Sequence, residues 1–214
     1  MDRRDVPWGT KILRARYVLR VKCDAQRLIS RFKARLVALG HLAIETIHYN
    51  ETYAPAARSA TVKLVFAIAA IMNLELRQYD CETAFLNADI DEEIYMYVPD
   101  GYEPTDETPD DWTKEEKEKH AQIKAGDVVR LCSSIYGMPQ SSRNWWKKIT
   151  LHLKSIGFKQ SVLDPGLMYR IDTKRYSVLA LVVDDIVLAT NEEKGVFVEE
   201  MRQHLGSLWV QTAS

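Results

Sequence analysis

The sequence predicts an α+β fold, organised as one domain with interleaved subdomains. Two pairs of β-prone segments are each separated by a short turn, which predicts antiparallel hairpins. Two further segments have the pattern of helices, one apolar on nearly every side and one amphipathic. No internal repeat or flexible linker divides the 214 residues, and their 46% apolar content is enough for one substantial core or two small ones.

The N-terminal third predicts a basic hairpin followed by a buried helix. Residues 16–22 (R-Y-V-L-R-V-K) and 30–37 (S-R-F-K-A-R-L-V) mix cations with β-prone apolar residues on either side of a turn. Residues 61–72 are almost wholly apolar and rich in alanine, so we expect a buried helix with Ser59 or Thr61 as its N-cap.

The middle of the chain predicts short strands around an acidic segment. We expect strands over 74–81 and 94–98, with a turn or short helix over 83–87 between them. Residues 100–126 are polar and acidic, which favours a surface insertion with a helix-prone stretch at 113–124; disorder is the alternative. Three elements should follow: a strand at 127–132, an amphipathic helix at 140–156 ended by Gly157, and a short strand at 166–171.

The strongest local signal is a second hairpin near the C-terminal end. Residues 176–183 and 186–189 are almost wholly apolar, and Asp184 and Asp185 interrupt them where the chain should turn. The pattern therefore predicts two acidic residues at the tip of two buried strands, followed by a charged helix over 192–205.

Charge is distributed unevenly along the chain, although the net charge is only -1. Residues 1–63 contain thirteen Lys and Arg against five Asp and Glu, whereas residues 89–118 contain thirteen acidic residues against two lysines. A polyanion needs only a local positive surface, so the basic first third is compatible with nucleic-acid binding. A solvated charged face is the alternative interpretation.

Several classes of protein are excluded by the composition. The longest apolar run, residues 64–72, is far shorter than the roughly 20 residues of a membrane span, and the first residues lack the apolar segment of a signal peptide. The three cysteines are widely spaced and form no C-x-x-C pair, which argues against a disulfide framework and a zinc site. We expect reduced thiols and a cytoplasmic protein.

Three carboxylates form a candidate metal site. Asp184 and Asp185 would repel each other at the end of apolar strands, and a divalent cation would relieve that repulsion. Asp80 ends a strand expected in the same sheet and is the natural third ligand. Three oxygen ligands with open positions suit Mg²⁺, which takes its remaining ligands from water and substrate phosphates. The alternative is that the Asp pair is simply a turn.

Five blocks of sequence carry a more specific signal. They are F-K-A-R-L-V-A-L-G (32–40), Y-N-E-T-Y-A-P-A-A-R (49–58), Q-Y-D-C-E-T-A-F-L-N-A-D-I-D-E-E-I-Y-M (78–96), S-I-Y-G-M-P-Q-S-S-R-N-W (134–145) and V-V-D-D (182–185). In this order and at this spacing they closely resemble the reverse transcriptase domain of Ty1/copia-type retrotransposons, from about Gly9 to Asn191. The resemblance implies an RNA-directed DNA polymerase encoded within a pol polyprotein.

The resemblance also implies an architecture. Such enzymes have a right-hand polymerase fold, with an antiparallel palm sheet packed on helices and with fingers that close over the incoming nucleotide. By this comparison residues 1–214 form a single reverse transcriptase domain fragment. The fingers would comprise about 1–58 and 91–145, and the palm about 59–90 and 146–214. The thumb would be absent, because the resemblance fades after Asn191.

Site residues can be assigned by matching positions to the family. The resemblance makes Asp80, Asp184 and Asp185 the catalytic carboxylates that hold two Mg²⁺ ions, with Mn²⁺ as a substitute. The resemblance also places five residues at the incoming nucleotide. The backbone carbonyl of Cys81 would lie near a metal, and the ring of Phe85 would lie beneath the sugar. The cations Lys33 and Arg35 would bind the triphosphate, and Gln140 would support the nucleotide and template. Without the resemblance, Phe85 would be interpreted as an ordinary core residue and Gln140 as a helix start. Trp145 and Trp146 favour core packing over base stacking.

The sequence departs from the family pattern at one position near the carboxylates. Val182 stands where the family normally has an aromatic residue that touches the primer. This change, with the absent thumb, leaves a second interpretation open: a catalytically decayed or truncated nucleic-acid-binding relic. The expected partners are an RNA or DNA template-primer and dNTPs, with RNase H and integrase segments elsewhere in a polyprotein and no membrane. The expected location is the cytoplasm, in a retrotransposon particle, or the nucleus.

Overall fold

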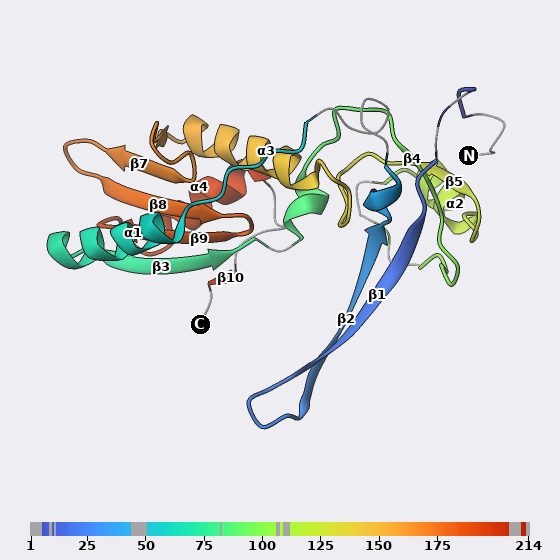
Figure 1. Cartoon of the computed structure of the whole chain (residues 1–214), viewed down its shortest axis with the longest axis horizontal. Coiled ribbons are helices and arrows are strands. Elements are labelled where there is room, and N and C mark those ends of the chain that lie inside the picture. Colours follow the sequence, from blue (N-terminus) through green and yellow to red (C-terminus); the bar gives the residue numbers. More distant parts are fainter. Residues whose placement is uncertain are drawn as a thin grey trace. The chain divides into compact units, whose positions relative to one another are not determined.

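The computed structural model describes residues 6–8, 10, 12–43, 51–81, 83–105, 108, 112–205 and 211–212. The fold is mixed α+β, and all strand pairs between its named strands are antiparallel. The chain divides into two compact units, each built from two separate segments (Figure 1). The first unit contains Met1–Asn50 and Ile90–Pro139, and the second contains Glu51–Asp89 and Gln140–Ser214.

The elements follow the expected order with small shifts in their bounds. The first unit contains β1 (Ala15–Cys23), β2 (Ile29–Ala38), the 3-10 turn η2 (Gly40–Leu42), β4 (Tyr95–Tyr97), α2 (Lys114–Ala121) and β5 (Val128–Arg130). The second unit contains α1 (Ser59–Met72), β3 (Glu75–Asp80), the 3-10 turn η3 (Ala84–Asn87), α3 (Ser141–Ser155), β6 (Lys159–Gln160), β7 (Leu167–Ile171), β8 (Tyr176–Val182), β9 (Asp185–Thr190), α4 (Val196–Leu205) and β10 (Gln211–Thr212).

The first unit combines a long hairpin with a small core. Strands β1 and β2 pair along their whole length, from Ala15 opposite Ala38 to a bulge near Cys23, which confirms the predicted hairpin. At its base, Leu13 pairs with Met96 of β4. The buried apolar residues of this unit are Leu13, Ala38, Ile94, Met96, Ile135 and Met138.

Two glycines bring distant parts of the first unit into contact. A Cβ atom on Gly40 would lie 1.9 Å from the Gly137 carbonyl oxygen, and one on Gly137 would lie 2.2 Å from the Ala38 carbonyl oxygen. Neither position has room for a side chain. Glycine at both positions therefore lets the end of β2 pack against the Y-G-M-P segment, which joins two of the blocks noted in the sequence.

The acidic insertion contains the helix that its sequence predicts. Helix α2 begins after Thr113, whose hydroxyl accepts the backbone N–H of Glu116 while the Glu116 carboxylate accepts the N–H of Thr113. This reciprocal capping box satisfies two donors of the first helical turn. The Tyr102 hydroxyl lies 3.0 Å from Nε2 of His120 and connects the helix to the preceding loop.

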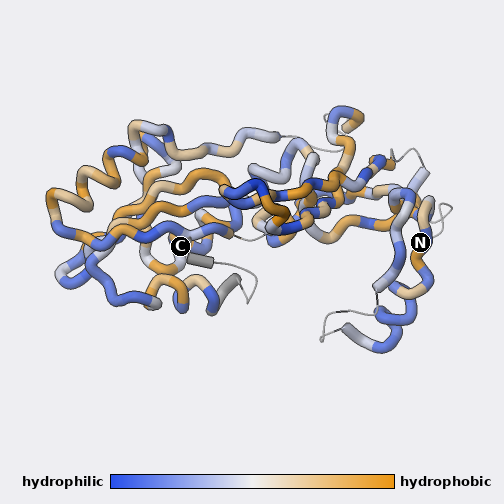
Figure 2. The backbone as a smooth tube through the Cα atoms, turned by 90° about the horizontal axis from the view of Figure 1, so that it is seen from below, coloured by the Kyte–Doolittle hydropathy of each residue, from blue (hydrophilic) through white to orange (hydrophobic). Residues whose placement is uncertain are grey.

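The second unit is a six-stranded antiparallel sheet with helices on both faces. Its strand order is β10-β3-β9-β8-β7-β6. Alternate residues of a strand point to opposite faces. Val178, Ala180 and Ala189 pack with α1, whereas Leu179, Leu181, Ile186 and Leu188 belong to a larger core with α3 and α4. Helix α1 therefore covers one face and α3 with α4 the other (Figure 1). Figure 2 shows that hydrophobic and hydrophilic stretches alternate along the backbone.

The N-cap of α1 differs from the prediction. The helix begins at Ser59 with Arg58 as its N-cap residue, and no side-chain cap comes from Ser59 or Thr61. The Asp164 carboxylate, in the loop before β7, accepts the Arg58 N–H and the Thr61 hydroxyl instead. The prediction was wrong because this cap comes from a distant loop and has no local sequence signature.

The last helix starts later than expected, at Val196 and not at residue 192. Glu192 donates its backbone N–H to the Thr190 hydroxyl, and the guanidinium of Arg77 binds the carbonyls of Glu192 and Glu193 at 2.8 and 3.2 Å. These side-chain bonds compete with helical bonds and hold the segment as a loop.

Candidate functional site

The candidate carboxylates lie at one end of the second unit's sheet. Asp80, the last residue of β3, stands directly opposite Asp185, the first residue of β9, and Asp185 is in turn opposite Val182 of β8. Directly opposed residues share a face of the sheet, with Cβ atoms roughly 4.5–5.5 Å apart. The structure therefore brings Asp80, Asp185 and Val182 into one row, with Asp184 in the adjoining turn.

The turn lies one residue earlier than the sequence suggested. Val183 and Asp184 form a two-residue connection, so Asp185 belongs to β9 and not to the turn. Val183 has φ of +58°, an unusual value for a β-branched residue. Local turn propensity favoured the two acidic residues as the turn, but pairing of Asp185 with both neighbouring strands sets the observed register.

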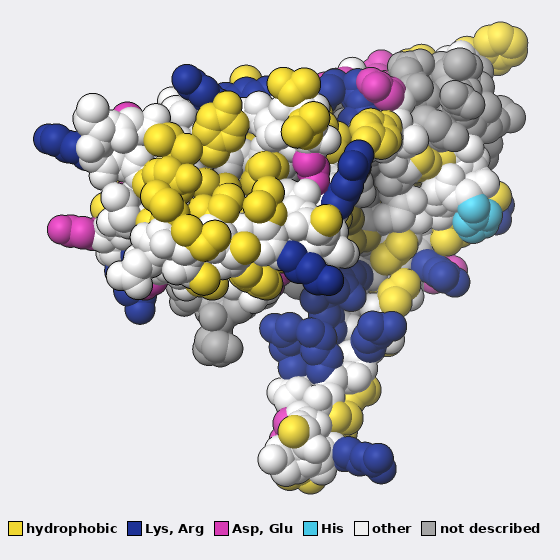
Figure 3. All heavy atoms as spheres, turned by 60° about the vertical axis from the view of Figure 1, so that its left-hand side comes forward, with side chains coloured by type: hydrophobic (Ala, Val, Ile, Leu, Met, Phe, Trp, Pro, Cys, Tyr) yellow, Lys and Arg dark blue, Asp and Glu magenta, His cyan; other side chains and the backbone are white. Residues whose placement is uncertain are grey.

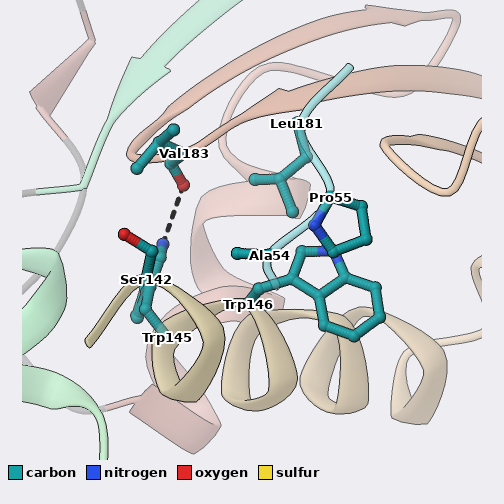
Figure 4. A pocket seen from close by; sticks show the side chains of 7 residues that line it. All are labelled: Ala54, Pro55, Ser142, Trp145, Trp146, Leu181 and Val183. Atoms are coloured by element: carbon teal, nitrogen blue, oxygen red, sulfur yellow. Dashed lines mark hydrogen bonds between the residues drawn. The ribbon is translucent and has the colours of Figure 1, made fainter. Parts of the chain in front are cut away.

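Two donors from different elements hold the backbone of this turn. The backbone N–H of Cys81 donates to the Asp184 carbonyl at 2.9 Å. Nε1 of Trp145, in α3, donates to the Val183 carbonyl at 2.8 Å (Figure 4). Both turn carbonyls are thus bound, while Asp80 and Asp184 remain exposed and Asp185 is half-buried.

Negative charge is concentrated around the buried Cys81. Burial, followed by the charges of Asp80, Asp184 and Asp185, raises the pKa of the Cys81 thiol to about 12. Within the part of the chain that the structure describes, neither Asp80 nor Asp185 has a Lys or Arg partner in an ion pair. Facing carboxylates destabilise a strand pair unless a cation neutralises them.

Sequence reasoning missed one polar neighbour of these acids. Nε2 of Gln78 donates to Oδ1 of Asp185 at 3.3 Å from the next row of the sheet. Gln78 lies two residues before Asp80, so strand alternation alone places both side chains on the same face. That spacing was the signal available in the sequence.

The donor set fits a hard divalent cation. Carboxylate oxygens are the ligands that Mg²⁺ prefers, and the exposed carboxylates of Asp80 and Asp184 leave positions open to water and substrate. Among the described residues, no three His, Cys, Asp or Glu side chains already converge as a metal-binding group. Binding an ion would therefore require these side chains to turn toward it.

Phe85 and Gln140 belong to the same unit as the carboxylates. Phe85 lies in η3, soon after Asp80, and is partly buried against the larger core. Thr83, just before η3, adopts φ of +51° and redirects the chain. Gln140 is 1% exposed and is the N-cap residue of α3, which agrees with the interpretation that it starts a helix.

Lys33 and Arg35 lie in the first unit, on one face of the β1–β2 hairpin. The register gives this face six cations, which we call the cationic face: Arg16, Arg20, Lys22, Arg31, Lys33 and Arg35. The opposite face carries Tyr17, Leu19, Val21 and Phe32. The guanidinium of Arg35 lies 5.3 Å from the centre of the Tyr136 ring, and Figure 3 shows Lys and Arg side chains gathered along the hairpin.

A small pocket of about 130 Å³ adjoins the Val183 turn (Figure 4). It is lined by Ala54, Pro55, Ser142, Trp145, Trp146, Leu181 and Val183. Trp145 is 1% exposed and belongs to the larger core, which confirms core packing for this residue. Trp146 is only partly buried and forms one wall of the pocket.

Comparison with known proteins identifies the family. A family model described as "Reverse transcriptase (RNA-dependent DNA polymerase)" matches residues 2–209. The chain is 30% identical over 196 residues to the "Retrovirus-related Pol polyprotein from transposon TNT 1-94" of Nicotiana tabacum, covering 91% of this chain and 13% of that protein.

Two other relatives show similar coverage. Identity is 28% over 186 residues to the "Retrovirus-related Pol polyprotein from transposon RE2" of Arabidopsis thaliana, covering 87% of this chain and 12% of the relative. Identity is also 28%, over 194 residues, to the "Transposon Ty1-H Gag-Pol polyprotein" of Saccharomyces cerevisiae, covering 83% of this chain and 9% of the relative. The chain thus spans 9–13% of the length of these relatives. No helix among the described residues is long and apolar enough to cross a membrane.

Proposed function

The chain belongs to the reverse transcriptase (RNA-dependent DNA polymerase) family of Ty1/copia type, and from this premise we propose that it carries the nucleotidyl-transfer site of an RNA-directed DNA polymerase. One observation carries the proposal most strongly. Asp80 and Asp185 face each other in the β3–β9 pair, and Asp184 lies in the adjoining turn. These are the three carboxylates that the sequence blocks single out.

In this proposal Asp80, Asp184 and Asp185 hold two divalent ions, with Mg²⁺ favoured by the all-oxygen ligands. When bound, the ions would activate the primer 3′-hydroxyl and neutralise charge on the triphosphate. The protein's own contribution is to hold Asp80 and Asp185 on one sheet face and Asp184 in the adjoining turn. The backbone bonds from Cys81 and Trp145 fix the turn that presents Asp184. Gln78 holds the Asp185 carboxylate.

The two compact units correspond, in this proposal, to the two parts of a right-hand polymerase. The second unit, with the sheet and the carboxylates, is the palm, and the first, with the cationic hairpin, is the fingers. Lys33 and Arg35 bind the triphosphate, and Gln140 supports the nucleotide. The ring of Phe85 excludes a 2′-hydroxyl and selects deoxyribonucleotides. An RNA or DNA template-primer and dNTPs are the proposed partners.

Primer extension on poly(rA)/oligo(dT) tests the proposal. We expect Mg²⁺-dependent dTTP incorporation by the 214-residue chain, reduced at least about a hundredfold by Asp185→Asn. Asp89→Asn is the matched control, because Asp89 is an exposed carboxylate of the same unit that pairs with Lys148. Mg²⁺ should also raise the melting temperature of the wild type and of the control but not of Asp185→Asn. Equal incorporation by wild type and Asp185→Asn would contradict this active site.

A decayed, nucleic-acid-binding relic is the second candidate, and Val182 is the observation that favours it. Val182 lies in the same row as Asp185, where the family normally has an aromatic residue. A relic would retain salt-sensitive RNA binding through the cationic face without extension. The variant Val182→Tyr separates the candidates: extension that appears only in this variant identifies decay at position 182.

A further inference from the structure

We propose that Trp145 is a positioning residue, whose indole N–H holds the turn that carries Asp184 and starts Asp185; this role rests on the proposed function. Nε1 of Trp145 donates to the Val183 carbonyl at 2.8 Å. The tryptophan lies on α3, 38 residues before the turn, and its indole N–H binds the backbone of the turn and not a carboxylate. It acts on the carboxylates only through the backbone.

The turn needs an external constraint because its conformation is unfavourable for its sequence. Val183 occupies the left-handed region, with φ of +58°. Glycine adopts this region freely, whereas the side chain of a β-branched residue crowds the following carbonyl. A strained residue persists only when its surroundings hold it in place. A turn of two residues offers few internal bonds that could do so.

The constraint consists of one donor on each carbonyl of the turn. The Cys81 N–H extends the β3–β9 ladder by one bond and fixes the Asp184 carbonyl. That bond leaves the Val183 carbonyl to another partner, and Nε1 of Trp145 supplies it from α3 (Figure 4). Removal of the indole donor would therefore free one of the two fixed points of the turn.

Trp145 is itself held rigidly, as a positioning residue must be. Its side chain is 1% exposed and belongs to the core cluster that includes Tyr79, Cys81, Leu181 and Ile186. The donor therefore sits in the same rigid core as the strands whose ends carry Asp80 and Asp185. Small movements of the turn are then resisted by the packing of α3 on the sheet.

The neighbouring tryptophan provides a natural comparison. Trp146 lines the same pocket, but in the described part of the chain its Nε1 has no hydrogen-bond acceptor. Both residues present an indole next to the Val183 turn, yet only Trp145 binds it. Loss of the indole N–H at position 145 should therefore alter the positions of the Asp184 and Asp185 carboxylates, whereas its loss at position 146 should not.

The test replaces the indole N–H with sulfur. The isosteric amino acid 3-benzothienylalanine is incorporated into the 214-residue chain at position 145 or, as the control, at position 146. Trp145→Phe serves as a second variant that keeps a buried ring without the N–H. Mn²⁺ affinity is measured by calorimetry, and amide hydrogen exchange at Asp184 and Asp185 is measured in the metal-free proteins.

We expect both Trp145 variants to bind Mn²⁺ roughly three- to tenfold more weakly than wild type and to exchange the two amides faster by a similar factor. The Trp146 variant should match wild type in both measurements. Equal exchange at Asp184 and Asp185 in all the proteins would overturn the positioning role. If Asp185→Asn binds Mn²⁺ as well as wild type does, the proposed metal site fails instead, while hydrogen exchange still decides the role of Trp145.

Discussion

Oδ2 of Asp164 accepts the backbone N–H of Arg58 at 3.1 Å, so a carboxylate from the loop before β7 caps a helix that begins more than a hundred residues earlier. The Thr61 hydroxyl donates to the same oxygen, and the Gly166 N–H donates to Oδ1 at 2.9 Å. Asp164 is 7% exposed. Burial raises its pKa, but the hydrogen bonds from Thr61, Arg58 and Gly166 outweigh burial and hold the pKa below its usual value.

Asp164→Asn should destabilise the second unit at neutral pH and weaken its acid sensitivity. The ionised cap stabilises the fold above the unfolded-state pKa of about 4, and this contribution is lost as pH falls through the lower folded-state pKa. We expect the unfolding free energy of the variant to be about 1–2 kcal/mol lower than that of wild type at pH 7. This difference should become smaller below about pH 4. Urea unfolding across pH measures both effects. A constant difference down to pH 2 would contradict the assignment, and Asp89→Asn should show neither effect.

Cys81 should resist thiol reagents that modify the other two cysteines. Cys23 and Cys132 are exposed, whereas burial and three nearby carboxylates raise the pKa of Cys81 to about 12. The thiolate is the reactive form, so iodoacetamide at pH 8 should label Cys81 at least about a hundredfold more slowly. Mass spectrometry of labelled peptides measures each rate. Comparable rates at all three cysteines would contradict the burial of Cys81 and the raised pKa of its thiol.

Phe85→Val should relax selection of the nucleotide sugar if the proposed function is correct. A smaller side chain in η3 leaves space for a 2′-hydroxyl, so the ratio of kcat/KM for dTTP over UTP should fall at least about tenfold. Leu86→Val is the control, because Leu86 is the neighbouring residue of η3 and is 43% exposed. An unchanged ratio in Phe85→Val would remove Phe85 from the nucleotide site.

Neutralising the cationic face should weaken RNA binding in a salt-dependent way. Arg20 and Arg31 are exposed cations of that face. Changing both to alanine should make the plot of log binding constant for RNA against log salt concentration less steep, by about 0.7 in slope for each lost phosphate contact. Lys114→Ala with Lys117→Ala removes two exposed cations of α2 in the same unit and should leave the slope unchanged. Equal slopes in the two double variants would exclude the hairpin as the binding surface.

Much of the fold could be predicted because the signals were local. The alternation of cations and apolar residues predicted β1 and β2, and apolar runs predicted α1, β8 and β9. Most of β8 and β9 is buried, whereas β1 and most of β2 are exposed or half-buried. The expectation that α1 is a buried helix was wrong, because only Thr61, Val65 and Ala69 are buried while Leu64, Phe66, Ile71 and Met72 stay exposed. Elements defined by partners far along the chain were harder. Strands β6 and β10 contain two residues each, and they depend on pairing with β7 and β3 respectively. Two residues are too few to form a periodic pattern, so the sequence could not predict these strands.

The candidate site shows the same division. Asp80 and Asp185 could be assigned to one sheet from the pattern of the strands. The residues of the turn could not be predicted exactly, because two adjacent acidic residues favour a turn at their own position. Pairing of Asp185 with Asp80 instead shifts the turn to Val183 and Asp184. The hydrogen bonds of Trp145 and Asp164 join elements that are distant in sequence. Neither Trp nor Asp carries a local signal for such a partner.

The interleaved segments also set the timing of assembly on the ribosome. β3 ends at Asp80 and its neighbour β9 begins at Asp185, so about 105 residues of chain separate them, which takes roughly 5–20 seconds to synthesise. During this interval the apolar helix α1 lacks β8 and β9, on which it packs, and strand β3 lacks its partner β9. The nascent chain must therefore pass through a stage in which its most hydrophobic helix is open to chaperones, and the paired carboxylates can form only after β9 has emerged.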